Sequence, residues 1–430
     1  MTFRSENNRK KHRFNGNRSV FIIIFCFILI ILLILCNLTI YIFIGTRYSQ
    51  NWDIETVDSN EKAWDTGCQI GLTPAGNPII EYKSQFGILM AYGKGDHNWQ
   101  HENIGGGANP GELSTMIVDN QGNIHLLYSA ANKQLIYAIK TEGTWKRQIV
   151  DPHVDRSFSL ACDENGNPYV VYAKYNYLNY TYQENGNWVK GIIDNVIIDG
   201  AIKMVLDSSK YPHILTRGES NNELRYYSWN GSNWSKEIID VQSYMKGSIL
   251  DFGIDSNNSP HIVIVDEQNA SLKLITKIGN EWDVMTVDTD NVQRGPAIAL
   301  DKQDMEHIVY YSSNNGLIYC RRDKNSWSIE IIDSSKRAGR FPSIIVDKAG
   351  NVHVAYIDRN VWHLNYATTK RSGFFRIIPI GITEYAIFIV ASMLIVIITF
   401  FSISRLLAWR KKKIENGKGP PGKKPIFFQR

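Results

Sequence analysis

Three arginines of this chain occupy one position of a recurring sequence pattern, and their chemistry suits an anion. Arg156, Arg294 and Arg340 each precede an aspartate by seven residues. A guanidinium presents a planar fork of N–H donors that matches a carboxylate, sulfate or phosphate. Convergence of the three side chains would create an anion site. The competing interpretation is local pairing with acidic neighbours, namely Asp155, Asp288 or Asp333.

The elements that position these arginines are copies of one strand-turn-strand repeat. Seven copies follow one another at intervals of 44–48 residues. A period of this length, built from short strands, is typical of a β-propeller in which each copy is one blade. The repeat is marked by an aspartate, replaced by threonine in the first copy, and by a tryptophan. These are Thr73, Asp119, Asp163, Asp207, Asp255, Asp301 and Asp347, and Trp52, Trp99, Trp145, Trp188, Trp234, Trp282 and Trp327.

The last copy indicates how the ring closes. Residues 343–347, 352–356 and 364–367 form three strand patterns, and the copy then stops at Lys370 without a fourth. The fourth-strand pattern occurs instead at the other end of the domain, in residues 52–58. We therefore expect this N-terminal strand to pair with 364–367, which removes two open sheet edges. The predicted fold is an all-β, seven-bladed β-propeller over 51–370.

Histidine recurs six residues after the aspartate in five of the seven copies, at His125, His213, His261, His307 and His353. A zinc site needs three or four ligands about 2 Å from the metal, and residues of five different blades are spread around a ring. We therefore expect a structural role, with each histidine hydrogen-bonded at a contact between blades. The tryptophans are expected to pack one blade onto the next. The sequence predicts no catalytic residue, no metal and no cofactor.

A second aspartate follows the tryptophan by six residues in six copies. We expect it to accept backbone N–H groups in the turn into the next blade. The six are Asp58, Asp151, Asp194, Asp240, Asp288 and Asp333.

The charge distribution bears on partners and topology. The net charge is +5, but residues 46–376 carry 32 basic and 39 acidic residues, so the basic excess lies at the two ends. An acidic domain argues against nucleic acid as a partner. Two apolar runs, at 20–44 and within 374–404, are long enough to cross a hydrocarbon core of about 30 Å. Both are flanked by lysine and arginine clusters on the side away from the propeller.

These features predict a two-pass membrane protein with both termini in the cytoplasm and the propeller outside the cell. The expected divisions are a basic tail at 1–19, a signal anchor at 20–44, the propeller at 51–370, an interfacial segment with the second span at 374–404, and a basic tail at 405–430. The bilayer is the first expected partner. Of five cysteines, Cys68, Cys162 and Cys320 belong to the propeller and lack disulfide-like spacing. Pairing of Cys68 with Cys162 stays open.

The pattern Asp-x-x-Gly-Asn-x-His-x-x-Tyr, present at 119–128 and 347–356, resembles the repeats of sialidase-like (BNR-type) β-propellers. The resemblance covers about 51–370 and implies the propeller more strongly than it implies an activity. Sialidases are expected to carry an arginine triad, for which Arg156, Arg294 and Arg340 are the only candidates. Their Ser-x-Asp-x-Gly-x-x-Trp boxes and a Tyr/Glu nucleophile pair are not recognisable here.

The sequence therefore favours a cell-surface propeller that binds a glycan or a partner protein, and not an enzyme. Two alternatives stay open. One is a membrane-tethered carbohydrate-active enzyme, either a sialidase-like glycosidase or a polysaccharide lyase. The other is an extracellular cap of a membrane protein complex. Fold alone does not decide among them, because propellers host many functions.

Overall fold

A computed structural model describes residues 52–369, except 61, 65–66, 96–97, 105–109, 156, 219–222, 242–250, 294, 324–325 and the side chains of 110–112 and 199. It also describes residues 404–405, 408–409 and 412, which are helical. The predicted spans at 20–44 and 374–404 and both basic tails lie almost wholly outside the described residues. None of the helices in the described part of the chain is long and apolar enough to cross a membrane.

The propeller contains 28 strands in seven four-stranded antiparallel sheets. Blade 1 consists of β2 (Cys68–Leu72), β3 (Pro78–Ser84), β4 (Gly87–Gly93) and β5 (Trp99–Asn103). Blade 2 consists of β6 (Pro110–Val118), β7 (Ile124–Ala130), β8 (Leu135–Thr141) and β9 (Thr144–Asp151). Blade 3 consists of β10 (Phe158–Cys162), β11 (Pro168–Lys174), β12 (Tyr177–Glu184) and β13 (Asn187–Asn195).

Blades 4 and 5 are β14 (Ile198–Leu206), β15 (Pro212–Gly218), β16 (Glu223–Trp229) and β17 (Trp234–Asp240), and β18 (Asp251–Ile254), β19 (Pro260–Asp266), β20 (Ser271–Ile278) and β21 (Glu281–Asp288). Blade 6 is β22 (Ala297–Leu300), β23 (Glu306–Ser312), β24 (Gly316–Asp323) and β25 (Ser326–Asp333). Blade 7 is β26 (Ala338–Val346), β27 (Val352–Asp358), β28 (His363–Thr369) and β1 (Trp52–Asp58).

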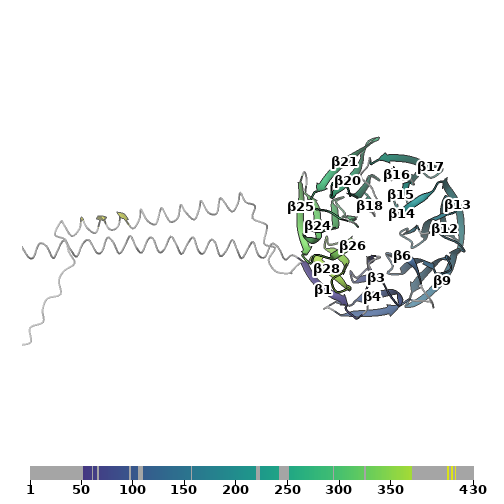
Figure 1. Cartoon of the computed structure of the whole chain (residues 1–430), viewed down its shortest axis with the longest axis horizontal. Coiled ribbons are helices and arrows are strands. Elements are labelled where there is room, and N and C mark those ends of the chain that lie inside the picture. Colours follow the sequence, from purple (N-terminus) through teal and green to yellow (C-terminus); the bar gives the residue numbers. More distant parts are fainter. Residues whose placement is uncertain are drawn as a thin grey trace, which may run out of the picture. The chain divides into compact units, whose positions relative to one another are not determined.

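The first strand of each repeat is innermost and the fourth lies at the rim. Figure 1 shows β6, β14, β18 and β26 around the axis, and β9, β13, β17, β21 and β25 outside them. The seven-bladed β-propeller predicted from the repeat is therefore confirmed.

Ring closure also follows the prediction. Strand β1 pairs antiparallel with β28, so that Trp52 lies opposite Thr369 and Asp58 opposite Leu364. The two ends of the described propeller thus lie side by side. The N-terminal strand thus completes blade 7, in which β28 would otherwise be the open edge.

The repeated aspartate closes the turn between the first and second strands of each blade. In the third blade, Asp163 Oδ1 accepts the backbone N–H groups of Asn165 and Asn167, each at 2.9 Å. Such a side chain mimics a backbone turn, which is why Asp or Asn is favoured there. In the first blade the Thr73 hydroxyl accepts the N–H of Asn77 at 3.1 Å instead. The arrangement of Asp163, in which one carboxylate oxygen accepts two backbone N–H groups, recurs at Asp119, Asp207, Asp255, Asp301 and Asp347.

The hydrophobic core is divided among the seven contacts between neighbouring blades. Each contact has its own cluster of buried side chains. The predicted packing of each tryptophan onto the preceding blade is visible in five ring contacts, such as Trp188 with Tyr137 at 5.3 Å. The others are Trp52–Tyr319, Trp99–Tyr366, Trp234–Tyr180 and Trp282–Tyr226.

A β-bulge near the end of the rim strand positions the second repeated aspartate. In the second blade the register shifts between Leu135 and Ile136 of β8, so that Val150 of β9 has no partner across the ladder. Val150 is 2% exposed and packs into the cluster between blades 2 and 3. The bulge therefore anchors the strand and presents Asp151, the next residue, to blade 3.

The three described cysteines are free thiols, so the open pairing of Cys68 with Cys162 is absent from the described propeller. Burial raises the pKa of all three thiols. Cys68, Cys162 and Cys320 therefore act as small hydrophobic side chains.

Candidate functional site

Of the three predicted anion-binding arginines, the structure describes one. Arg340 lies on β26 and is half-buried, with its guanidinium carbon 5.6 Å from the centre of the Tyr311 ring of blade 6. Arg156 and Arg294 lie outside the described residues. The convergence of the three side chains therefore stays a prediction.

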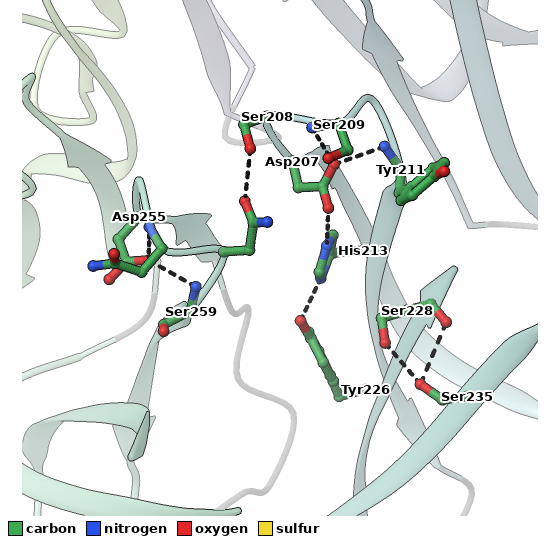
Figure 2. A network of polar contacts seen from close by, with 12 residues as sticks. Asp207, Ser208, Ser209, Tyr211, His213, Tyr226, Ser228, Ser235, Asp255 and Ser259 are labelled. Atoms are coloured by element: carbon green, nitrogen blue, oxygen red, sulfur yellow. Dashed lines mark hydrogen bonds and ion pairs between the residues drawn. The ribbon is translucent and has the colours of Figure 1, made fainter. Parts of the chain in front are cut away.

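Each of four repeated histidines lies in a chain of hydrogen bonds within its blade, from the repeated aspartate through the histidine to a tyrosine, which we call a relay. His125 lies 3.1 Å through Nε2 from Asp119 Oδ2 and 2.7 Å through Nδ1 from the Tyr137 hydroxyl. Figure 2 shows the equivalent Asp207–His213–Tyr226 relay of blade 4. The same chain occurs at Asp301–His307–Tyr319 and Asp347–His353–Tyr366. These hydrogen bonds lie within one blade, whereas the sequence suggested a contact between blades.

The relay histidines are poorly suited to catalysis. Burial lowers the pKa of His125, and the hydrogen bond and charge of Asp119 only partly oppose it. A neutral ring can donate from one nitrogen to the carboxylate and accept from the tyrosine with the other. Both ring nitrogens are then occupied, so the relay stabilises the blade and leaves no lone pair for a substrate.

Blade 5 departs from this pattern, and its histidine makes the predicted contact with the next blade. His261 contacts Asp255 at 3.5 Å and, through Nδ1, Glu306 of the next blade at 3.1 Å. Burial lowers the pKa of His261, but the hydrogen bond and charge of Glu306, followed by those of Asp255, outweigh it and raise the pKa. Arg322 also contacts Glu306 at 3.0 Å. No group of three or more potential ligands in the described part of the chain could hold a metal ion.

Five of the six second repeated aspartates join neighbouring blades, each by accepting a tyrosine hydroxyl from the following blade. In four of them, Asp58, Asp151, Asp288 and Asp333, the other oxygen caps the turn, as expected. Asp151 accepts the N–H of His153 at 3.0 Å and the hydroxyl of Tyr172 at 3.0 Å. The other pairs are Asp58–Tyr82, Asp194–Tyr227, Asp288–Tyr310 and Asp333–Tyr356.

At Asp151 this joint opens into a pocket of about 290 Å³ between blades 2 and 3, which we call the Asp151 pocket. Asp151 comes from the end of β9 in blade 2, and every other lining residue comes from blade 3. The lining residues are Asp151, Tyr172, Lys174, Tyr175, Tyr177, Asn179, Lys190, Gly191 and Ile192.

Two lysines hold the carboxylate at the wall of the pocket. Lys174 Nζ lies 2.7 Å from Asp151 Oδ1, and Lys190 Nζ lies 3.0 Å from Oδ2. Burial alone would raise the pKa of Asp151, but hydrogen bonds from Lys174, His153 N–H, Lys190 and Tyr172 lower it to about 2. The carboxylate is 3% exposed and ionised, so it orients both ammonium groups.

An exposed aromatic ring lies beside this polar cluster. Tyr175 and Asn176 form the two-residue turn between β11 and β12, with φ of 52° and 63°. Turns of this kind favour Asn-Gly, because side chains larger than these strain the left-handed conformation. A tyrosine nevertheless occupies this position. Tyr175 is 62% exposed, and its ring stacks on His153 with 4.8 Å between the ring centres and 9° between the planes.

Sequence reasoning missed this pocket because two of its groups, Lys174 and Tyr175, are departures from the repeat. The position of Lys174, eleven residues after the repeated aspartate, holds Ser84, Ala130, Gly218, Asp266, Ser312 and Asp358 in the other blades. Lys190 has an equivalent in Lys236, which contacts Asp194 at 2.8 Å between blades 3 and 4. Only a comparison of the copies for unmatched lysine and tyrosine residues would have signalled the site.

Comparison with known proteins defines the fold and no family. No family model and no curated protein matches the chain. Among solved structures it is similar to YCF48 from Cyanidioschyzon merolae, with 12% identity and a TM-score of 0.51 over 75% of this chain and 99% of that one.

Two further similar structures are a six-bladed fucose-recognising lectin of Aleuria aurantia and the NanB sialidase of Streptococcus pneumoniae. The lectin has 15% identity and a TM-score of 0.48 over 63% of this chain and 96% of that one. The sialidase has 12% identity and a TM-score of 0.42 over 73% and 70%. At these identities the likeness concerns the fold alone, and the propeller itself is established by the seven four-stranded sheets.

Proposed function

We propose that this chain is a membrane-anchored recognition module whose propeller lies outside the cell and binds a glycan in the Asp151 pocket. The apolar runs at 20–44 and 374–404, with lysine and arginine clusters beyond them, support the anchoring and the orientation. The pocket supports the ligand class.

The observation that carries the proposal is the exposed Tyr175 ring next to convergent polar groups. A sugar ring has an apolar face of C–H groups and an edge of hydroxyls, so it suits a site that combines an aromatic face with hydrogen-bonding side chains. Tyr175 and Tyr177, 62% and 38% exposed, supply aromatic surface. Lys174, Lys190 and Asn179 supply polar groups within the same pocket.

The acid–base properties of the pocket favour binding over turnover. A general acid or base works best with a pKa near the operating pH. Interactions with Lys174, His153, Lys190 and Tyr172 hold the pKa of Asp151 at about 2, while burial and Asp151 raise that of Tyr172. The pocket therefore offers ionised and hydrogen-bonded groups that orient a ligand.

A steric block of the pocket tests this function. Ile192 is 61% exposed and lines the pocket. Ile238 of β17 is the equivalent residue in blade 4; it is 60% exposed and does not line the pocket. Full-length protein in nanodiscs should bind a subset of an immobilised glycan panel. Ile192→Trp should weaken that binding at least about tenfold, since it fills the cavity, whereas Ile238→Trp should not.

Two results would contradict the proposal. One is the absence of binding to every glycan of a broad panel. The other is equal binding by the two tryptophan variants. Mass spectrometry of the bound glycans after incubation separates recognition from catalysis, because a recognition module returns them unchanged.

A further inference from the structure

The charges of the Asp151 pocket identify the class of glycan. Among its lining residues are two ammonium groups, Lys174 and Lys190, and one carboxylate, Asp151. With the pKa of Asp151 at about 2, the carboxylate is ionised at neutral pH, and the lining carries a net charge of one positive unit. The surrounding segment, residues 46–376, has the opposite excess, with 39 acidic and 32 basic residues.

Hydrogen-bonding capacity points in the same direction. An ammonium group has three N–H donors, and the Asp151 carboxylate accepts one from Lys174 and one from Lys190. The described residues offer neither lysine another hydrogen-bond acceptor, and Lys174 Nζ also lies 5.6 Å from the centre of the Tyr175 ring. The remaining donors belong to groups that are 25% and 43% exposed in the pocket, where an incoming acceptor can reach them.

A neighbouring carboxylate does not cancel this charge at the lining. Asp155 accepts the backbone N–H of Tyr175 at 2.9 Å and lies 3.6 Å from His153. It is not among the residues that line the pocket. It orients the turn that carries the Tyr175 ring.

The next joint between blades shows what a balanced site looks like. Asp194 accepts from Tyr227 and from a single lysine, Lys236, each at 2.8 Å. The position that holds Lys174 in blade 3 holds Gly218 in blade 4. The second ammonium is thus a local addition to a repeated joint, and it coincides with the pocket and with the exposed ring of Tyr175.

We propose that the Asp151 pocket selects a sugar that carries an anionic group, a carboxylate or a sulfate ester, with the anion on Lys174 and Lys190 and the ring against Tyr175. This inference rests on the proposed glycan-binding function and adds the substrate class. A charge-assisted hydrogen bond in a partly desolvated site favours the anion over a hydroxyl.

The test uses full-length protein in nanodiscs and three sets of probes. The first contains oligosaccharides of galacturonate, glucuronate and N-acetylneuraminate. The second contains the same compounds after chemical reduction of each carboxylate to an alcohol, and the third contains sulfated galactose oligomers. We expect binding to at least one acidic probe, loss of about tenfold or more on carboxyl reduction, and weaker binding as NaCl is raised. The sulfated set decides between the two anions.

Matched lysine variants assign the effect to the pocket. Lys190→Ala should weaken binding of the acidic probe by about tenfold or more, while Lys190→Arg should retain most of it and Lys236→Ala all of it. Equal melting temperatures would show that the variants are folded. Preference for the neutral probes, or equal effects of Lys190→Ala and Lys236→Ala, would overturn the inference and leave glycan binding standing. Failure to bind any acidic or neutral glycan would overturn both.

Discussion

Replacing Tyr175 by asparagine separates a binding role from a structural one. Tyr175 occupies the left-handed region with φ of 52°, and this region costs a side chain other than glycine or asparagine about 1–2 kcal/mol. Asparagine tolerates the conformation and relieves most of that cost. The substitution also removes the stack on His153, and an aromatic pair contributes roughly 0.5–1.5 kcal/mol.

The two contributions oppose each other and have similar size. The free energy of unfolding of Tyr175→Asn should therefore stay within about 1 kcal/mol of the wild type. Glycan binding should fall by about tenfold or more, because the exposed ring is lost from the pocket. Chemical denaturation and isothermal titration calorimetry measure the two quantities on the same preparation.

Phe86 provides the control, since it lies in the equivalent turn of blade 1, is 54% exposed and does not line the pocket. Phe86→Asn should leave binding unchanged. A Tyr175→Asn variant that binds like the wild type would refute the role of the ring. A loss of stability above about 2 kcal/mol would show that the ring is retained for packing.

Three further outcomes follow from the joints between blades. The pKa of Asp151 in the folded protein is depressed to about 2, so the ionised carboxylate stabilises the fold above its unfolded-state pKa, and this stabilisation is lost as pH falls. Asp151→Asn should therefore lower the free energy of unfolding by ~2 kcal/mol at pH 7. In denaturation titrations, the difference from wild type should vanish between about pH 4 and 2. The pKa of His261 is raised by Glu306, so the stability advantage of wild type over Glu306→Gln should be full just below the unfolded histidine pKa of about 6.5, where Glu306 is ionised, and should decline as pH rises above it. A Cβ at Gly191 would lie 2.2 Å from the Tyr180 ring, so Gly191→Ala should lower the melting temperature and cost about 1–3 kcal/mol.

The repeat predicted the fold because every copy encodes the same local structure. The aspartate turn, the buried second strand and the tryptophan recur in register, and the unmatched segment 52–58 left one pairing for ring closure. Because the pattern occurs seven times, a strand that is unclear in one copy can be recognised from the equivalent residues of the others. For this reason both the blade number and the closing strand could be read from the chain.

The candidate site could not be read in the same way. Asp151 was predicted to cap a turn, and it does so with one oxygen. Its second oxygen and the two lysines belong to a contact between blades, which depends on the bulge before Asp151 and on how neighbouring sheets pack. The Trp234 indole provides a second example of a feature, at a contact between blades, that sequence reasoning did not predict. In the described part of the chain its buried N–H has no partner, because Gly191 stands where the preceding blades carry the Glu102 and Gln148 acceptors for Trp145 and Trp188.

The most direct measurement is an experimental structure of the full-length chain with a bound acidic oligosaccharide. We expect the sugar between blades 2 and 3, with its anionic group within hydrogen-bond distance of Lys174 and Lys190 and its ring against Tyr175. Density for the sugar beside Arg340, with the Asp151 pocket filled only by water, would contradict the account.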